Sequence, residues 1–486
     1  MSQGKIVPVM VAAVLAFVAF CANAKEFNVG DYGAVGNGTT LCTASIQKAI
    51  DAAATAGGGT VMFPKGKFLT GALFIKSGVE FRVDEGVELD AITNDADYPQ
   101  KPTRIAGIEI TWPSALLNVY EQKNVKITGK GIIDGHGEFW WRKFWGEDGH
   151  SGMLGDYTKR GLRWATDYDC QRIRTLVVYK SKNVAVRDLT LKRSGFWTVQ
   201  ICYSDRVKVD GLKIRANANS ASEGKAGEVS EGGVTIRGNI ANYGPSSDGV
   251  DIDSSKNVEV SHCDIDCNDD DICLKAGRDA DGLRVNRPTE NISIHDCITR
   301  AGHGMLTIGS ETSGGIRNVD VYNIKAIGTS NGIRFKSARI RGGVIKNIRF
   351  HDIEMDNVPD PIFCELNWYP SYSYAVIPTN ISPDKIPAYW KVLATPVPPQ
   401  KGIPEFRDID IKNLKVTGAD EAIYVNAFAE KPLRNVCMEN VSIEAKTAGV
   451  ITNAVDWKLK NVVFKIADRK NVTLHNSPDV PLPKLD

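Results

Sequence analysis

Asn257-Val258-Glu259-Val260 is the stretch that decides the fold, because close variants of it recur along the chain. It returns as Asn291-Ile292-Ser293-Ile294, Asn318-Val319-Asp320-Val321 and Asn347-Ile348-Arg349-Phe350, at spacings of 34, 27 and 29 residues. In each copy an asparagine precedes apolar residues that alternate with polar ones, which is typical of a strand with one buried face. Strands that return at such spacing predict an all-β solenoid, in which each turn buries its apolar face only against its neighbours.

Counting onward from each asparagine indicates which side chains share a column of the solenoid. The residues fifteen and seventeen positions after Asn257, Asn291 and Asn318 are always apolar, and we expect them to face inward. These residues are Ile272, Leu306 and Ile333 in one column and Leu274, Ile308 and Phe335 in the other. The residues at positions sixteen and eighteen must then face outward, so Arg334 and Lys336 are expected to project from one exterior face.

Three carboxylates are candidates for acid–base chemistry in this solenoid. Asp248 lies 21 residues before Asp269, about one turn, so Asp248, Asp269 and Asp270 are expected to cluster on neighbouring turns. Glycosidic cleavage uses a carboxylic acid that protonates the leaving oxygen and a carboxylate at the anomeric carbon. Clustered carboxylates cannot all ionise easily, so we expect one pKa to rise and that group to be the acid. An Asp-Asp pair alone also suits a turn or a calcium site.

Three further side chains favour a catalytic site over a turn. His303 shares its column with Asp269, about 4.8 Å away on the next turn, and is expected to support that carboxylate. Glycines on both sides of His303 would let the backbone turn tightly. Arg334 and Lys336 are suited to pairing with the carboxylate of an acidic sugar, through solvent-exposed contacts that salt would weaken.

Regions outside the repeat are expected to close the solenoid or shape its surface. Residues 43–56 read as an amphipathic helix with an apolar stripe of Ala44, Ile46, Ala49 and Ile50, which would cap the first turn. Two long insertions, residues 217–245 and residues 359–405, are expected to line the binding face. In the second insertion, Trp368 or Tyr369 is the candidate to line a cleft.

Composition places the protein outside the cell and away from nucleic acid. Residues 1–24 have a basic start, an apolar stretch and an Ala-Asn-Ala end, which predict a signal for export to the periplasm or beyond rather than a membrane anchor. No other segment is apolar enough to insert into a membrane. The net charge of +1 over 486 residues gives no general basic field for nucleic acid. We expect residues 25–486 to form a single catalytic domain.

Nine of the ten cysteines follow residue 24, an odd number that requires at least one free thiol or an intermolecular bond. Cys263, Cys267 and Cys273 are close enough in sequence to suggest a metal, but no second cluster at zinc-finger spacing accompanies them. We therefore expect structural cysteines. Cys263 and Cys297 share a column and are expected to be stacked thiols, with a disulfide as the alternative.

Four ordered motifs give the chain a family resemblance: Ser247-Asp248-Gly249-Val250-Asp251, Asn268-Asp269-Asp270, Gly302-His303-Gly304 and Arg334-Phe335-Lys336. They resemble those of glycoside hydrolase family 28, the polygalacturonase-like enzymes of pectin degradation. The stretch Gly277-Arg278-Asp279-Ala280-Asp281-Gly282-Leu283-Arg284-Val285-Asn286 is similar to that of bacterial, often exo-acting, members.

The resemblance implies a right-handed parallel β-helix and hydrolysis with inversion, without a metal or organic cofactor. Asp269 would be the general acid, Asp248 and Asp270 would activate water, and His303 would support the acid. Arg334 and Lys336 would hold a galacturonate carboxylate of a pectic polysaccharide or oligogalacturonide. Ser246 departs from the family pattern, which has asparagine there.

Three other functions stay open at this point. A rhamnogalacturonan galacturonohydrolase would attack galacturonate next to rhamnose. A pectate lyase shares the β-helix but needs calcium and forms unsaturated products. A binding solenoid without catalysis would tolerate Asp269→Asn. The oligomeric state, the methyl-ester tolerance and the choice between exo and endo action do not follow from the sequence.

Overall fold

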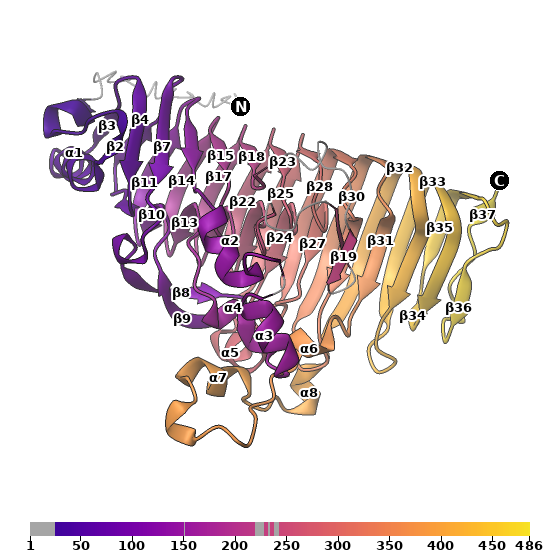
Figure 1. Cartoon of the computed structure of the whole chain (residues 1–486). Helices are drawn as coiled ribbons and strands as arrows, with labels where there is room; N and C mark the ends of the chain where they lie inside the picture. Colours follow the sequence, from indigo (N-terminus) through magenta and orange to yellow (C-terminus); the bar gives the residue numbers. More distant parts are fainter. Residues whose placement is uncertain (1–24, 150, 219–227, 232–233, 238–242) are drawn as a thin grey trace, which may run out of the picture.

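The predicted solenoid is confirmed: the chain forms a right-handed parallel β-helix (Figure 1). The structure is a computed structural model that describes residues 25–149, 151–218, 228–231, 234–237 and 243–486. Within these residues, 33 strands join one continuous sheet that coils from the N-terminal end to the C-terminal end. The predicted export signal at residues 1–24 lies outside the described part.

The coil has three strand faces, and the chain passes from one to the next at each corner. The first face contains the asparagine repeats and pairs in parallel through β1 (Glu26–Asn28), β3 (Gly59–Met62), β6 (Val79–Arg82), β11 (Lys123–Thr128), β14 (Lys182–Arg187), β17 (Asp205–Asp210), β22 (Lys256–Ser261), β25 (Thr289–His295), β28 (Ile316–Ile327), β30 (Val344–Asp356), β32 (Glu405–Asn426), β33 (Leu433–Thr452), β35 (Lys458–Ile466) and β37 (Lys484–Leu485).

The second and third faces complete each rung. The second contains β2 (Asn37–Leu41), β4 (Gly66–Thr70), β7 (Val87–Ala91), β12 (Ile132–Asp134), β15 (Thr190–Lys192), β18 (Lys213–Arg215), β23 (Asp264–Asp266) and β26 (Ile298–Thr299). The third contains β5 (Leu73–Phe74), β10 (Leu117–Tyr120), β13 (Leu176–Tyr179), β16 (Val199–Cys202), β21 (Val250–Asp253), β24 (Ile272–Lys275), β27 (Leu306–Ile308), β29 (Asn331–Lys336), β31 (Asp360–Glu365) and β36 (Thr473–His475). The two-residue β34 (Ala454–Val455) pairs with the start of β33.

The repeated asparagines mark a left-handed backbone position at the start of the first face. Asn257, Asn291, Asn318 and Asn347 have φ angles between 54° and 58°, a region that asparagine tolerates better than most residues. Their side chains form a ladder, because each amide nitrogen donates to the amide oxygen of the preceding rung at 3.1 or 3.2 Å. The motif therefore supplies a turn and a bond between rungs at the same residue.

The inward columns are confirmed by register and burial. Leu306 pairs with Ile333 and Ile308 pairs with Phe335 across β27 and β29, and all four are at most 2% exposed. Each such side chain contributes about 1.5–3 kcal/mol when it leaves water, and the columns continue along the coil as one apolar core.

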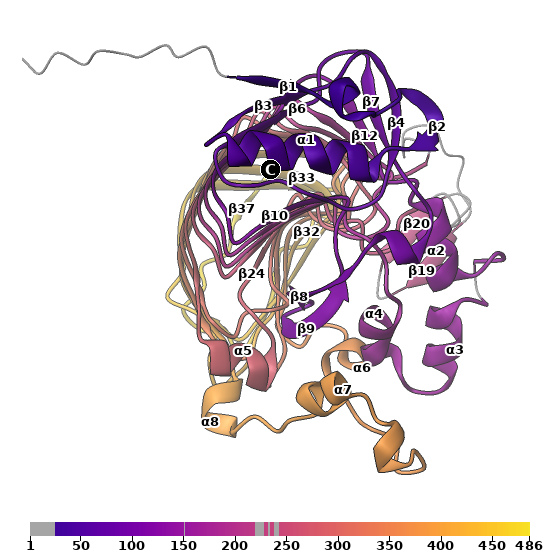
Figure 2. The same cartoon turned by 90° about the vertical axis from the view of Figure 1, so that its left-hand side faces the viewer.

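The predicted capping helix is α1 (Thr43–Thr55), which lies across the first rung (Figure 2). Its buried stripe is Ile46, Ala49, Ile50 and Ala53. The prediction was wrong for Ala44, which is exposed, because the stripe follows the helical spacing toward the C-terminal end of the helix. The helix covers core residues that would otherwise be left open at the end of the coil.

The remaining helices lie outside the coil. They are α2 (Glu138–Trp145), α3 (Met153–Lys159), α4 (Thr166–Asp169), α5 (Asp279–Val285), α6 (Pro370–Ser373), α7 (Ala388–Leu393) and α8 (Pro399–Gly402). Two antiparallel hairpins accompany them, β8 (Gln100–Ile105) with β9 (Ile108–Pro113), and β19 (Glu228–Glu231) with β20 (Val234–Arg237). None of the helices in the described residues is both long and apolar enough to cross a bilayer.

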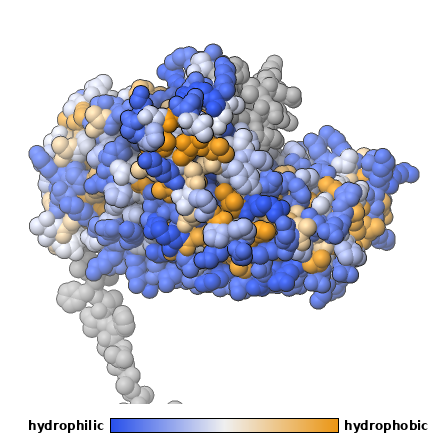
Figure 3. Space-filling view, turned by 90° about the horizontal axis from the view of Figure 1, so that it is seen from below, coloured by the Kyte–Doolittle hydropathy of each residue, from blue (hydrophilic) through white to orange (hydrophobic). Residues whose placement is uncertain are grey.

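A second apolar core holds these loops to the coil. Trp112 of β9, Trp164, Trp390 of α7 and Phe196 are buried in one cluster outside the main core. Seen from below, the surface of the molecule shows apolar residues near its middle among mainly hydrophilic ones (Figure 3). The loops are thereby fixed as a wall beside the third strand face.

All nine described cysteines are free thiols, and eight of them are buried. The structural role and the thiol stack predicted for Cys263 and Cys297 are confirmed. The Cys297 thiol and burial together raise the pKa of Cys263 well above its usual value. Cys263, Cys267 and Cys273 do not gather into one metal-binding group among the described residues.

Candidate active site

A pocket opens on the third strand face, with about 910 Å³ of empty space when its open mouth is included. Its floor is formed by outward side chains of consecutive rungs, and its walls by loop residues from the segments 138–169 and 359–405. All of the predicted site residues line it: Asp248, Asp269, Asp270, His303, Arg334 and Lys336. The prediction that these residues lie close together is therefore confirmed.

The three carboxylates come from two neighbouring rungs. The register of β21 and β24 aligns Val250 with Ile272, which places Asp248 level with Asp270. One oxygen from each of Asp248, Asp269 and Asp270 lies within 4.8 Å of the others. The predicted clustering is confirmed, with Asp248 opposite Asp270 rather than opposite Asp269.

Asp270 is held by both of the predicted substrate cations. Arg334 Nη1 donates to its Oδ1 at 3.1 Å, and Lys336 Nζ donates to its Oδ2 at 2.7 Å. Arg334 and Lys336 are only 3% and 5% exposed, so the expectation of solvent-exposed ion pairs was wrong. Trp368 covers Lys336, whose Nζ lies 4.6 Å from the ring centroid. An ammonium and a guanidinium buried in this way are screened less by salt than exposed cations.

Asp269 is the carboxylate that a ligand can reach. Its side chain is 26% exposed, whereas those of Asp248 and Asp270 are 3% and 1% exposed. A bridge between Asp270 and Gly304 places Asp269 level with His303, and His303 Nδ1 lies 3.5 Å from Asp269 Oδ1. The predicted column of Asp269 and His303 is confirmed.

The glycines beside His303 serve close packing. The backbone bends at Gly302 and His303, as expected, although neither Gly302 nor Gly304 has a positive φ. A Cβ on Gly304 would lie 2.4 Å from Thr307 Oγ1, and one on Gly302 would lie 2.8 Å from Asp271 Oδ2. These contacts bring the His303 backbone against the carboxylate cluster, where a larger residue would push it away.

One of the three carboxylates has a raised pKa, as predicted, but it is Asp248 and not Asp269, to which the resemblance assigns the acid. Burial, with the charges of Asp251 and Asp269, raises the pKa of Asp248 well above its usual value. Burial favours the same change at Asp269, but the charge and hydrogen bond of His303 outweigh it, so the pKa of Asp269 is lowered. At Asp270, Lys336 and Arg334 overcome burial and lower the pKa far below its usual range. The raised pKa that the acid requires is found on Asp248 in the ligand-free protein.

Sequence reasoning missed two charged residues behind the three clustered carboxylates. Lys275 Nζ lies 3.4 Å from Asp248 Oδ2 and 3.6 Å from Glu311 Oε2. Lys275 occupies the same outward column as Lys336, so its position was available from the repeat, although its partners were not. Glu311 lies in the connection between β27 and β28, which has no repeating pattern.

The loop segments deliver a second ion pair to the pocket. Arg163 Nη1 donates to Asp167 Oδ2 at 2.9 Å, and the guanidinium lies over the rings of Tyr369 and Tyr372 at 5.4 and 5.3 Å. Ser246 donates its hydroxyl to Asp167 Oδ1 at 3.2 Å. The departure of Ser246 from the family pattern is thus matched by a partner from α4.

Both predicted insertions reach the pocket, one of them only in part. Trp368 and Tyr369 of residues 359–405 line it, as predicted. Of residues 217–245, the segments 219–227, 232–233 and 238–242 lie outside the described residues. The described Pro245, at the end of this insertion, does line the pocket.

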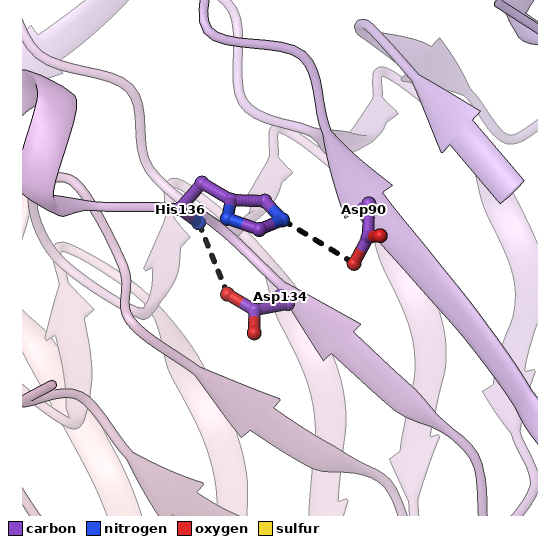
Figure 4. Close-up of side chains that lie close together, drawn as sticks. All are labelled: Asp90, Asp134 and His136. Atoms are coloured by element: carbon purple, nitrogen blue, oxygen red, sulfur yellow. Dashed lines mark hydrogen bonds and ion pairs between the residues drawn. The ribbon is translucent and has the colours of Figure 1, made fainter. Parts of the chain in front are cut away.

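A separate cluster of Asp90, Asp134 and His136 lies on the second face (Figure 4). His136 Nε2 lies 3.4 Å from Asp90 Oδ1, and the His136 backbone N–H donates to Asp134 Oδ1 at 3.1 Å. Arg193 donates to both Asp134 oxygens, at 2.9 and 2.7 Å, and contacts His136 Nδ1 at 3.1 Å. The Arg193 guanidinium thus provides positive charge beside the two aspartates. The cluster holds the start of the segment that contains α2 against the coil.

A parallel β-helix whose pocket gathers one reachable and two deeply buried carboxylates in a cluster supplies the groups that a glycoside hydrolase uses. Residues 57–386 match the family model of Glycosyl hydrolases family 28, and the chain belongs to that family. Residues 26–82 also match the model of Rhamnogalacturonase A/epimerase, pectate lyase-like.

Relatives with known names span most of the chain. It is 27% identical to an exo-poly-alpha-D-galacturonosidase of Dickeya chrysanthemi, covering 94% of this chain and 75% of the relative. It is 26% identical to an endo-polygalacturonase of Pectobacterium carotovorum subsp. carotovorum, covering 88% of each. The crystal structure of a hyperthermoactive exopolygalacturonase from Thermotoga maritima superposes with a TM-score of 0.70 at 25% identity, covering 95% of both chains.

Proposed function

We propose that this chain is an exported exo-polygalacturonase that removes galacturonate from the ends of pectic chains with inversion at the anomeric carbon. The observation that carries the proposal is the pocket itself: three clustered carboxylates lie at its base, and walls from two loop segments stand around them. Because loops stand around the pocket, the end of a sugar chain can enter it more easily than an internal segment of the chain. The named relatives include exo-acting and endo-acting enzymes on polygalacturonate.

Asp269 is proposed as the general acid because it is the reachable carboxylate. Its lowered pKa in the free protein leaves it mostly ionised, so the substrate has to change this. A bound uronate brings a negative charge and excludes water, and both effects favour the protonated form of a neighbouring carboxyl group. The acid would therefore acquire its proton as the substrate binds, and His303 would orient it.

Asp248 and Asp270 are proposed to direct the attacking water. One O–H bond of the water breaks and its proton passes to Asp248, while its oxygen bonds to the anomeric carbon. The glycosidic C–O bond breaks, and the leaving oxygen takes the proton of Asp269. Asp270 stays ionised between Arg334 and Lys336 and accepts a hydrogen bond from the water. Solvent then returns a proton to Asp269 and removes one from Asp248.

Inversion needs space for water between the carboxyl groups. Oxygens within 4.8 Å of one another put the carboxyl carbons at most about 7.3 Å apart, after adding two C–O bonds of about 1.23 Å. This limit reaches only the lower part of the ~6.5–9.5 Å range of inverting enzymes, so the stereochemistry needs a direct test. Proton NMR of the first product from a reduced oligogalacturonide would show the β-anomer for inversion and the α-anomer for retention.

Recognition of the uronate carboxylate is proposed to use cations that already have protein partners. A guanidinium has five N–H donors, so Arg334 can bond a second carboxylate beside Asp270. Arg163 lies across the same pocket on its tyrosine pair. We expect a neutral galactan to be a poor substrate for this reason.

Product analysis tests the function. Purified protein is expected to release only monomer from polygalacturonate and to act poorly on rhamnogalacturonan. Oligomers of mixed length would show endo action, and a preference for rhamnogalacturonan would favour the galacturonohydrolase. An unsaturated uronide that disappears with a chelator would overturn hydrolysis.

Export through residues 1–24 to the periplasm or medium, with residues 25–486 as one catalytic domain, is part of the proposal. Fractionation of cells that express the full chain tests it.

A further inference from the structure

One buried lysine serves several carboxylates behind the pocket. Lys275 Nζ lies 3.3 Å from Asp251 Oδ1, 3.4 Å from Asp248 Oδ2 and 3.6 Å from Glu311 Oε2. The four side chains come from three successive rungs, and each residue is at most 5% exposed. A single positive charge therefore faces three acidic groups in a site that water hardly enters.

Glu311 has its own stabilisation. It accepts hydrogen bonds from Tyr372 and Ser310, and Arg341 Nη1 lies 4.0 Å away. Although burial opposes ionisation, Lys275 and Arg341 lower the pKa of Glu311 to about 2. Glu311 is thus ionised at any pH well above 2, and it competes with Asp248 and Asp251 for the positive charge of Lys275.

Asp248 and Asp251 have much less support. Among the described residues, Asp248 Oδ1 and both oxygens of Asp251 make no hydrogen bond of good geometry, although Lys275 Nζ lies 3.3 Å from Asp251 Oδ1. Burial of an ionised carboxylate without such bonds costs several kcal/mol, and two negative charges side by side cost more. Both pKa values are raised, that of Asp251 to about 7. The pair is therefore expected to keep one proton.

We propose that Asp251 and Lys275 are positioning residues that set the ionisation of Asp248, with the two aspartates sharing a single proton. This inference rests on the proposed function, in which Asp248 has to be ionised to accept a proton from water. Asp251 directly follows Val250 on β21, and one of its oxygens lies within 4.8 Å of an Asp248 oxygen. Asp248 and Lys275 line the pocket, whereas Asp251 does not. It has no contact with substrate to make, so its effect has to pass through Asp248.

The charged neighbours of the pair fix the sign of each effect. Asp248 faces Asp251, Asp269, Asp270 and Lys275, and Asp251 faces Asp248, Asp270 and Lys275. The Cys273 thiol and the Arg174 guanidinium complete the surroundings of Asp251. Among these, Asp251 is the nearest negative charge that the reaction does not use, and Lys275 is the nearest positive charge.

Two substitutions should move the pH profile in opposite directions. Asp251→Asn removes a negative charge beside Asp248, so the acidic limb of kcat/KM should shift to lower pH. Lys275→Met removes the positive charge, so the same limb should shift to higher pH. Each shift is expected to be about one pH unit or more. At pH values above the acidic limbs of both enzymes, the activity of Asp251→Asn should stay within a few-fold of that of wild type.

The matched control is Asp253→Asn, on the same strand. Asp253 is equally buried but pairs with Arg104 at 3.1 Å, so its loss should leave the limb in place. If Lys275→Met does not fold, Lys275→Arg keeps the charge and should keep the wild-type limb, while Asp251→Asn still decides the question. Equal limbs in wild type and Asp251→Asn, or shifts of both variants in one direction, would overturn the inference.

The test separates this inference from the proposed function. If wild type hydrolyses no pectic substrate, the proposed function fails. Carbon-13 NMR titration of labelled aspartate carboxyls, assigned with the Asp248→Asn variant, still compares the Asp248 midpoint in wild type and Asp251→Asn without turnover. A lower midpoint in Asp251→Asn supports the shared proton, and an unchanged midpoint refutes it.

Discussion

Asp269→Asn should separate catalysis from folding. Asparagine keeps the shape of the side chain and an oxygen that can accept the Asp270 N–H, which now donates to Asp269 Oδ1 at 3.0 Å. Asp269 is the most exposed of the three carboxylates and its contact with His303, at 3.5 Å, is long, so little stabilisation is lost when the carboxylate becomes an amide. We therefore expect a change in unfolding free energy within about 0.5 kcal/mol, as for other surface substitutions.

The loss of activity should be far larger. A general acid contributes about 10²–10⁴-fold to the rate. At 1.36 kcal/mol for each factor of ten, this corresponds to about 2.7–5.4 kcal/mol in the activation free energy. Because asparagine can still contact the sugar, kcat should fall while KM stays within a few-fold.

The assay is release of reducing sugar from oligogalacturonides, with thermal unfolding as the check on folding. Asp296→Asn is the matched control, since Asp296 is also a half-exposed aspartate that pairs with a histidine, His295, at 2.7 Å, outside the pocket. The control should keep full activity. If Asp269→Asn retained more than a tenth of wild-type kcat, the assignment of the acid would be refuted.

Other perturbations probe the charges around the pocket. Asp270→Asn leaves Arg334 and Lys336 buried without a counter-charge, so chemical denaturation should show a loss of about 3–5 kcal/mol in addition to lost activity; unchanged stability would contradict the buried clamp. Arg163→Gln should raise KM for oligogalacturonides several-fold and leave kcat nearly unchanged, and a lower kcat with normal KM would assign Arg163 a different role. Wild-type stability should fall as pH rises from about 4 to about 7, since Asp251 keeps its proton in the folded chain above its unfolded pKa of about 3.9; urea titrations should find this contribution missing in Asp251→Asn.

The coil and the residues that meet on it could be predicted because they obey a period. The positions of Ile272, Leu306 and Ile333 fix which residues face inward, and the same count places Asp269 beside His303. Lys275 was in a predicted outward column. The repeat does not reveal, however, which carboxylates surround its ammonium group.

What lies over an outward face could not be predicted. Arg334 and Lys336 point outward, as expected, but Trp368 and the loop walls bury them, and Asp270 binds them both. The positions of Arg163 and Asp167 depend on packing within a long insertion of irregular sequence. This insertion has no repeat from which the position of a side chain can be counted. The raised pKa of Asp248, rather than Asp269, follows from this same enclosure.

The asparagine ladder has a consequence for how such enzymes diversify. From Asn257 to Asn347, each rung is aligned with the one before it by a hydrogen bond between asparagine side chains at one corner. A change in loop length elsewhere in a rung therefore does not shift the register of the next rung. The opposite corners can then gain or lose dozens of residues, as between β12 and β13 or between β31 and β32, without disturbing the stacking. New specificities can arise by lengthening a loop, while the scaffold that holds the acidic groups stays unaltered.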